Sequence, residues 1–148
     1  ADSAFQATFL EPVGQEQVLL AASVNLAVGI SGLAIMGQLE NFVERPGDWC
    51  NPDTELGNIR PRQEPFSIIG SLAVIMGIGK YKYGIDGDYG YTLIMGFLGA
   101  VVGNKIACSL GKETDSRWAK LALNGLIAPI TSAMFGVFGY HSHVLKAD

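Results

Sequence analysis

The chain has 148 residues, of which 49% are hydrophobic and only 16% are charged, and its mean hydropathy is +0.27. Because soluble domains carry roughly 25% charged residues, this composition favours residence in a membrane. A net charge of -4 at pH 7 gives no basic surface for phosphate groups, which excludes nucleic acid as a partner.

The first predicted membrane helix is the uncharged run of residues 17–39, between Glu16 and Glu40. At about 1.5 Å per residue, its 23 residues can cross a hydrocarbon core of roughly 30 Å. Residues 1–16 form a short acidic segment, interrupted by Pro12 and Gly14. We expect this segment to lie along the membrane surface or against a partner.

Residues 40–65 are predicted to form a proline-rich loop outside the membrane. The stretch contains nine charged residues and four prolines, and each proline removes a backbone donor that a helix needs. Trp49 is a natural anchor at the membrane interface. We expect this loop to dock a partner through Arg45, Trp49, Arg60 and Arg62.

Three further spans are predicted, over residues 66–84, 89–110 and 121–143. The segment of residues 66–84 has an uncharged centre of only 14 residues before Lys80. Pro129 is expected to kink the helix of residues 121–143. In the span of residues 89–110, small residues form a helix-packing face at Gly96, Gly99 and Gly103. The fold class is therefore an all-α polytopic membrane protein with about four spans in one domain, residues 1–148. Three spans plus a kinked or interfacial fourth helix are the alternative.

The distribution of basic residues predicts the orientation of these spans. Seven lysines and arginines fall on the side of the two long connectors, and three fall on the other side. The positive-inside rule then places the connectors in the cytoplasm, matrix or stroma. Cys50 and Cys108 share that side, where reducing conditions favour free thiols over a disulfide bond.

Several polar residues in or near the apolar segments are candidates for binding. His141 and His143 are expected to be polar residues at the interface, with axial contact to a pigment metal as the alternative. Asn25, Asn104 and Asn124 are expected to hydrogen-bond helices together, although an amide can also ligate a pigment or line a pathway. The pigment-binding candidates are thus His141, His143 and Asn25. No catalytic or metal-binding motif occurs in the sequence.

Short fragments within residues 1–110 carry a family resemblance. They are DSAF followed by TF (residues 2–9), Leu56-Gly57 with Arg60, Ile69-Gly70 with Leu72, Tyr83-Gly84, and GFLGAVVG in the third span. Together they are similar to the photosystem I subunit that organises the trimer region, subunit XI. The resemblance implies an accessory subunit at a photosystem edge, in contact with chlorophyll, carotenoid and neighbouring subunits. It assigns no pigment ligand, and that family has three spans where four are predicted here.

The sequence therefore predicts a non-catalytic structural accessory subunit of a multisubunit energy-converting membrane complex, most simply a photosystem. Its partners would be membrane lipid and neighbouring subunits. The thylakoid is the expected membrane, with the mitochondrial and bacterial inner membranes as alternatives. The alternative function is a small independent transporter or channel whose pathway is lined by Asn25, Asn104 and Asn124.

Overall fold

The computed structural model describes residues 6–142, without the side chains of residues 60–64. Throughout this range the chain forms helices joined by short connections, with no strand, which confirms the all-α class. The elements in order are η1 (Gln6–Leu10), α2 (Pro12–Ile35), α3 (Leu39–Glu44), η2 (Pro46–Cys50), α4 (Glu55–Gly77), η3 (Ile78–Lys82), α5 (Tyr89–Gly111) and α6 (Arg117–Tyr140).

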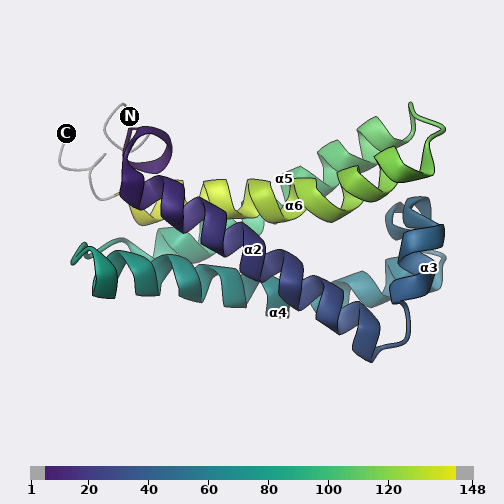
Figure 1. Cartoon of the computed structure of the whole chain (residues 1–148), viewed down its shortest axis with the longest axis horizontal. Helices are drawn as coiled ribbons and strands as arrows, with labels where there is room; N and C mark the ends of the chain where they lie inside the picture. Colours follow the sequence, from purple (N-terminus) through teal and green to yellow (C-terminus); the bar gives the residue numbers. More distant parts are fainter. Residues whose placement is uncertain (1–5, 143–148) are drawn as a thin grey trace.

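The four long helices α2, α4, α5 and α6 form an elongated bundle (Figure 1). The start of α2 and the end of α6 lie at one end of the bundle, and α3 lies at the opposite end. We call α3 and η2, residues 39–50, the cap. Gly37 allows the turn from α2 into the cap, because its φ of 73° is open to glycine and rarely to other residues.

Three helices, α2, α5 and α6, are long and apolar enough to cross a membrane. Length and composition therefore identify an integral membrane protein. Helix α4 has a comparable 23 residues, but charged residues occur in its first part, and only residues 66–79 form an uncharged run. The expected four spans thus correspond to three apolar helices and a fourth that is polar where it begins.

The prediction that residues 40–65 form a loop is wrong for most of the segment. Residues 39–50 fold into the cap, and α4 begins at Glu55, after Thr54 caps it by accepting a hydrogen bond from the Gly57 N–H at 3.3 Å. Pro61 and Pro65 lie within α4. Because they are four residues apart, their missing backbone bonds fall on one side of the helix, and the rest of the ladder continues.

Part of the segment that precedes the first predicted span is helical. Residues 6–10 form η1, and α2 begins at Pro12, the first helical position that proline favours. Thr8 is only 1% exposed, so η1 packs against the helix bundle.

Two hydrophobic clusters hold the bundle and the cap. The larger lies between the long helices and contains Ala21, Ile68, Leu72, Ile75, Ala100, Ala133, Val137 and Tyr140. The smaller joins the cap to α2 and α4 and contains Leu33, Phe42, Trp49 and Leu56. Trp49 is 8% exposed and packs edge-on against Phe42, with ring centroids 5.4 Å apart. The expected interface anchor is therefore a core residue of the cap.

The small-residue face of α5 packs against α6 of the same chain. Gly96, Gly99 and Gly103 are all buried. A Cβ atom at Gly99 would lie 2.6 Å from the Thr131 carbonyl oxygen, and one at Gly103 would lie 2.9 Å from the Ala128 Cα atom. These distances show that the two backbones approach each other where side chains are absent.

We predict that Gly99→Leu destabilises the fold by about 1–3 kcal/mol, because the added side chain must displace the backbone of α6. Thermal unfolding in detergent, followed by circular dichroism, measures this loss. Gly77→Ala is the control, since a Cβ atom there meets nothing within 4 Å. Equal stability of Gly99→Leu and Gly77→Ala would contradict this close approach.

Candidate functional site

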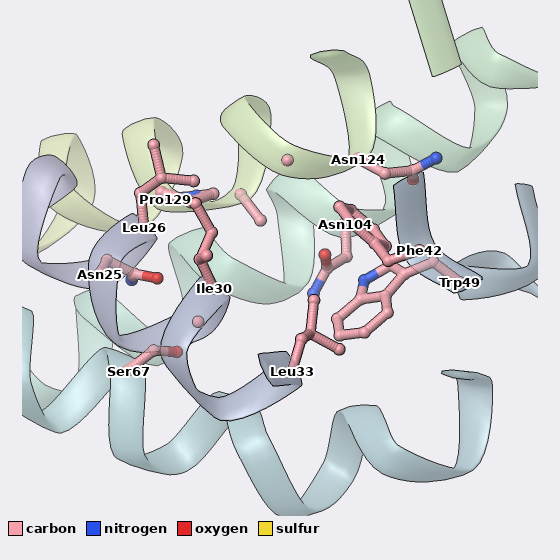
Figure 2. Close-up of a pocket in the computed structure, with 13 residues that line it drawn as sticks. Asn25, Leu26, Ile30, Leu33, Phe42, Trp49, Ser67, Asn104, Asn124 and Pro129 are labelled. Carbon is pink, nitrogen blue, oxygen red and sulfur yellow. The ribbon is translucent and has the colours of Figure 1, made fainter. Parts of the chain in front are cut away.

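A cavity of about 80 Å³ lies between the long helices, next to the cap (Figure 2). Each long helix contributes one polar side chain to its lining: Asn25 from α2, Ser67 from α4, Asn104 from α5 and Asn124 from α6. The rest of the lining is largely apolar and includes Leu26, Ile30, Leu33, Phe42, Trp49 and Pro129. The fold therefore gathers four polar groups, from distant parts of the sequence, in one mainly apolar space.

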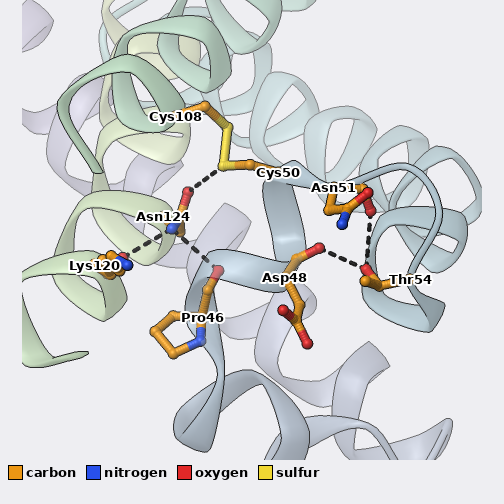
Figure 3. Close-up of a disulfide and its surroundings, with 8 residues drawn as sticks. All are labelled: Pro46, Asp48, Cys50, Asn51, Thr54, Cys108, Lys120 and Asn124. Carbon is orange, nitrogen blue, oxygen red and sulfur yellow. Dashed lines mark hydrogen bonds between the residues drawn. A yellow bond between two sulfur atoms is a disulfide. The ribbon is translucent and has the colours of Figure 1, made fainter. Parts of the chain in front are cut away.

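Asn124 binds α6 to the cap. Its amide nitrogen donates to the carbonyl oxygens of Pro46 at 3.2 Å and Lys120 at 3.0 Å (Figure 3). Its amide oxygen lies 3.3 Å from Sγ of Cys50. That sulfur belongs to a disulfide and carries no hydrogen, so we treat this approach as a contact and not a hydrogen bond. Asn124 therefore has the helix-joining role that its position in an apolar segment predicts.

Asn25 differs from Asn124, because no described residue hydrogen-bonds its amide. The residue is 7% exposed, and its side chain lines the cavity. A buried amide without a partner costs about 1–3 kcal/mol. The cavity is thus the place where a partner for Asn25 would lie.

His141 is buried at the end of α6, with 2% exposure, and not exposed at the interface as predicted. Its Nε2 atom lies 2.9 Å from Oε1 of Gln17, while Nε2 of Gln17 donates to the Ile75 carbonyl oxygen at 2.8 Å. The second bond fixes the orientation of the Gln17 amide, so His141 must donate through Nε2. Because this nitrogen carries a proton, it is not a ligand for a pigment metal in this arrangement. His143 lies outside the described residues.

The predicted site residues therefore do not form one pigment site. Asn25 lies at the cavity, whereas His141 contacts Gln17 near the start of α2. Gln17 and Ser67 were not among the predicted candidates. Their only sequence signal is a polar side chain within an apolar run, and both are buried.

A disulfide bond joins Cys50 to Cys108, which corrects the expectation of free thiols (Figure 3). It connects the cap to the last turn of α5, across a sequence separation of 58 residues. The expectation failed because the predicted orientation placed both cysteines in a reducing compartment. Disulfides persist in oxidising compartments, whereas the predicted orientation places this bond in a reducing one.

A polar cluster lies at the end of the bundle opposite the cap. Both Lys82 and Tyr83 donate to the carboxylate of Glu16, and they tie the segment after α4 to the start of α2. The carboxylate raises the pKa values of the Lys82 amine and the Tyr83 hydroxyl, because it hydrogen-bonds the protonated form of each. The cluster is partly exposed and joins two segments that are 66 residues apart in the sequence.

The remaining predicted docking residues lie at the cap or in α4. The side chain of Arg45 is 63% exposed and pairs with Asp48, with 3.6 Å between Nε and Oδ2. The backbones of Arg60 and Arg62 lie in α4, and their side chains are outside the described part of the chain. Among the described side chains, no group of three or more His, Cys, Asp or Glu residues is arranged to hold a metal ion.

Comparison with known proteins found no matching protein-family model, no matching curated protein and no matching solved structure.

We predict that Gln17→Leu lowers the free energy of unfolding by about 1–3 kcal/mol, because it removes the buried hydrogen bonds of the Gln17 amide to His141 and to the Ile75 carbonyl oxygen. Gln15→Leu is the matched control, since Gln15 is exposed and bonds only the carbonyl oxygen of Phe9. Chemical unfolding in detergent measures both variants. Similar small losses in the two variants would argue against a buried role for Gln17.

We also predict that the purified chain reacts with a maleimide-polyethylene glycol reagent only after reduction, when it gains two labels on an electrophoresis gel. Reduction should lower stability by about 2–4 kcal/mol, because the open chain regains conformational freedom. Labelling of sealed native membranes, after reduction by a membrane-impermeant agent, identifies the side of the cap. Labelling without reduction would contradict the disulfide.

Proposed function

We propose that the protein is a non-catalytic structural subunit of a multisubunit energy-converting membrane complex, and that the complex is a photosystem in the thylakoid. The observation that carries this proposal is the folded cap. In a chain of 148 residues, a hydrophobic cluster and a disulfide bond fix a rigid surface just outside the apolar helices. A rigid surface loses little conformational freedom when a partner binds it.

The outer surface of the cap suits a polar partner. A groove of about 390 Å³ is lined mainly by polar side chains, including Arg45, Asp48, Asp53 and Glu55. Acidic groups outnumber basic ones here, which favours a partner segment with basic side chains. In this proposal, the cap docks a neighbouring subunit, and Arg45 is the predicted docking residue that lies at the groove.

The membrane-facing surface provides a second contact region. Large apolar side chains are exposed along α5, including Leu93, Ile94, Phe97, Leu98 and Val101. Lipid, neighbouring helices or the hydrocarbon parts of chlorophyll and carotenoid can cover such a surface. The resemblance of short fragments to photosystem I subunit XI favours the pigment-bearing complex over a respiratory one.

The alternative function is a small transporter or channel. The observation that favours it is the convergence of Asn25, Asn104 and Asn124 on one cavity. Flux through the purified chain in liposomes tests this alternative, and transport by the isolated chain would replace the subunit proposal.

The subunit proposal predicts that the chain co-migrates with a large chlorophyll-bearing complex after gentle solubilisation and native electrophoresis. The absorption spectrum of the band identifies the pigment. Asp53→Lys should weaken incorporation several-fold, because it replaces an acidic group of the docking groove with a positive charge that repels basic side chains of the partner. Asp86→Lys is the matched control, since Asp86 is an exposed aspartate that does not line the groove. Migration of the wild-type chain alone would overturn the proposal.

A further inference from the structure

We infer that the cavity between α2 and α6 binds the polar end of a linear, uncharged lipid that carries a hydroxyl or carbonyl group. The first observation is the Asn25 amide, which is buried at the cavity and has no hydrogen-bond partner among the described residues. Buried amides are normally paired, and the amide of Asn25 is accessible from the cavity, so a ligand bound there would be its partner. An amide both donates and accepts, and it can therefore bind either a hydroxyl or a carbonyl group.

A second polar group of the lining comes from the backbone of α6. Pro129 has no N–H, so the carbonyl oxygen of Gly125 lacks its usual helical donor four residues later. Both residues line the cavity. A hydroxyl group bound in the cavity would contact the amide of Asn25, and the cavity wall also contains the Gly125 carbonyl oxygen as an acceptor.

The shape of the cavity favours a linear molecule. Its walls include Leu26 and Ile30 on successive turns of α2, and Gly125 and Pro129 on successive turns of α6. A Cβ atom at Gly125 would meet nothing within 4 Å, so the absence of a side chain leaves open space on the α6 side. The volume of about 80 Å³ is too small for a tetrapyrrole ring or a phospholipid headgroup.

The location of the cavity favours a lipid over bulk water. Helices α2 and α6 are both long and apolar enough to span a membrane, and Ile30 is 44% exposed on the outer surface beside the cavity. The groove between these helices therefore faces hydrocarbon, from which water is excluded. A lipid tail can remain in the bilayer while the polar end reaches Asn25. Such a ligand would bind whether or not the chain belongs to a larger complex.

Photolabelling of the full chain in lipid vesicles tests this inference. The probe is 3-azioctanol, a linear alcohol whose photoreactive group lies close to its hydroxyl. Mass spectrometry should locate the label on Leu26, Ile30 or Pro129, and excess 1-octanol should compete with it whereas octane should not. Asn25→Leu should reduce this labelling about tenfold, which corresponds to the loss of one hydrogen bond to the alcohol.

Two further variants keep the outcome independent of the stability of Asn25→Leu. Gly125→Leu retains Asn25 but fills the open space, and it should also abolish the label. Asn51→Leu is the matched control, because Asn51 is an exposed asparagine in the turn that precedes α4, and its labelling should equal that of wild type. Labelling that is spread over the lipid-facing surface and unaffected by Asn25→Leu would overturn the inference and leave water as the partner of Asn25.

Organic extraction of the protein purified from its native membrane identifies the natural ligand. Mass spectrometry of the extract distinguishes an isoprenoid alcohol or ketone from an acyl lipid. Either class, retained by wild type and lost from Asn25→Leu, supports the inference. An extract with no such molecule enriched over the Asn25→Leu variant contradicts it.

Discussion

The backbones of α5 and α6 approach each other only because glycine occupies the contact on α5. Neighbouring helices in a bilayer gain no hydrophobic burial from association, since lipid tails are as apolar as their side chains, and close packing must replace that driving force. Gly99 and Gly103 place the α5 backbone against Thr131 and Ala128 of α6. The Ser132 hydroxyl adds a hydrogen bond to the Gly96 carbonyl oxygen at 2.9 Å. This hairpin is the frame to which α2, α4 and the cap are attached.

Polar residues then fix both ends of the bundle to that frame. Near the chain termini, Gln17 connects α2 with His141, beyond α6, and with Ile75 of α4. At the cap, Asn124 of α6 bonds the carbonyl oxygen of Pro46. In an apolar environment each of these groups would be costly without its partner, so the arrangement with all of them paired is strongly favoured over alternatives. Asn25 differs from these residues, because no described residue hydrogen-bonds its amide.

Patterns along the chain predicted much of the bundle, because hydrocarbon imposes simple local rules. Long, mainly apolar runs indicated about four spans, and three of them coincide with helices long and apolar enough to cross a membrane. The glycine spacing in α5 indicated a packing face, and its partner is α6 of the same chain. The start of α4 was missed because its prolines, four residues apart, interrupt one side of the helix only. The burial of Trp49 and the pairing of Cys50 with Cys108 depend on how the cap folds back onto the bundle. No local sequence pattern predicts this packing. For the candidate site, the polar type of Asn25, Asn104 and Asn124 was visible in the sequence, but their convergence required the helix arrangement.

The disulfide also turns part of the chain into a closed covalent loop. Residues 50–108 contain α4, the connection after it and most of α5, and the two cysteines meet at the cap end of the bundle, with 5.7 Å between their Cα atoms. In the folded chain this loop runs the length of the bundle and back. A single cut of the backbone between the two cysteines therefore still leaves one covalent molecule.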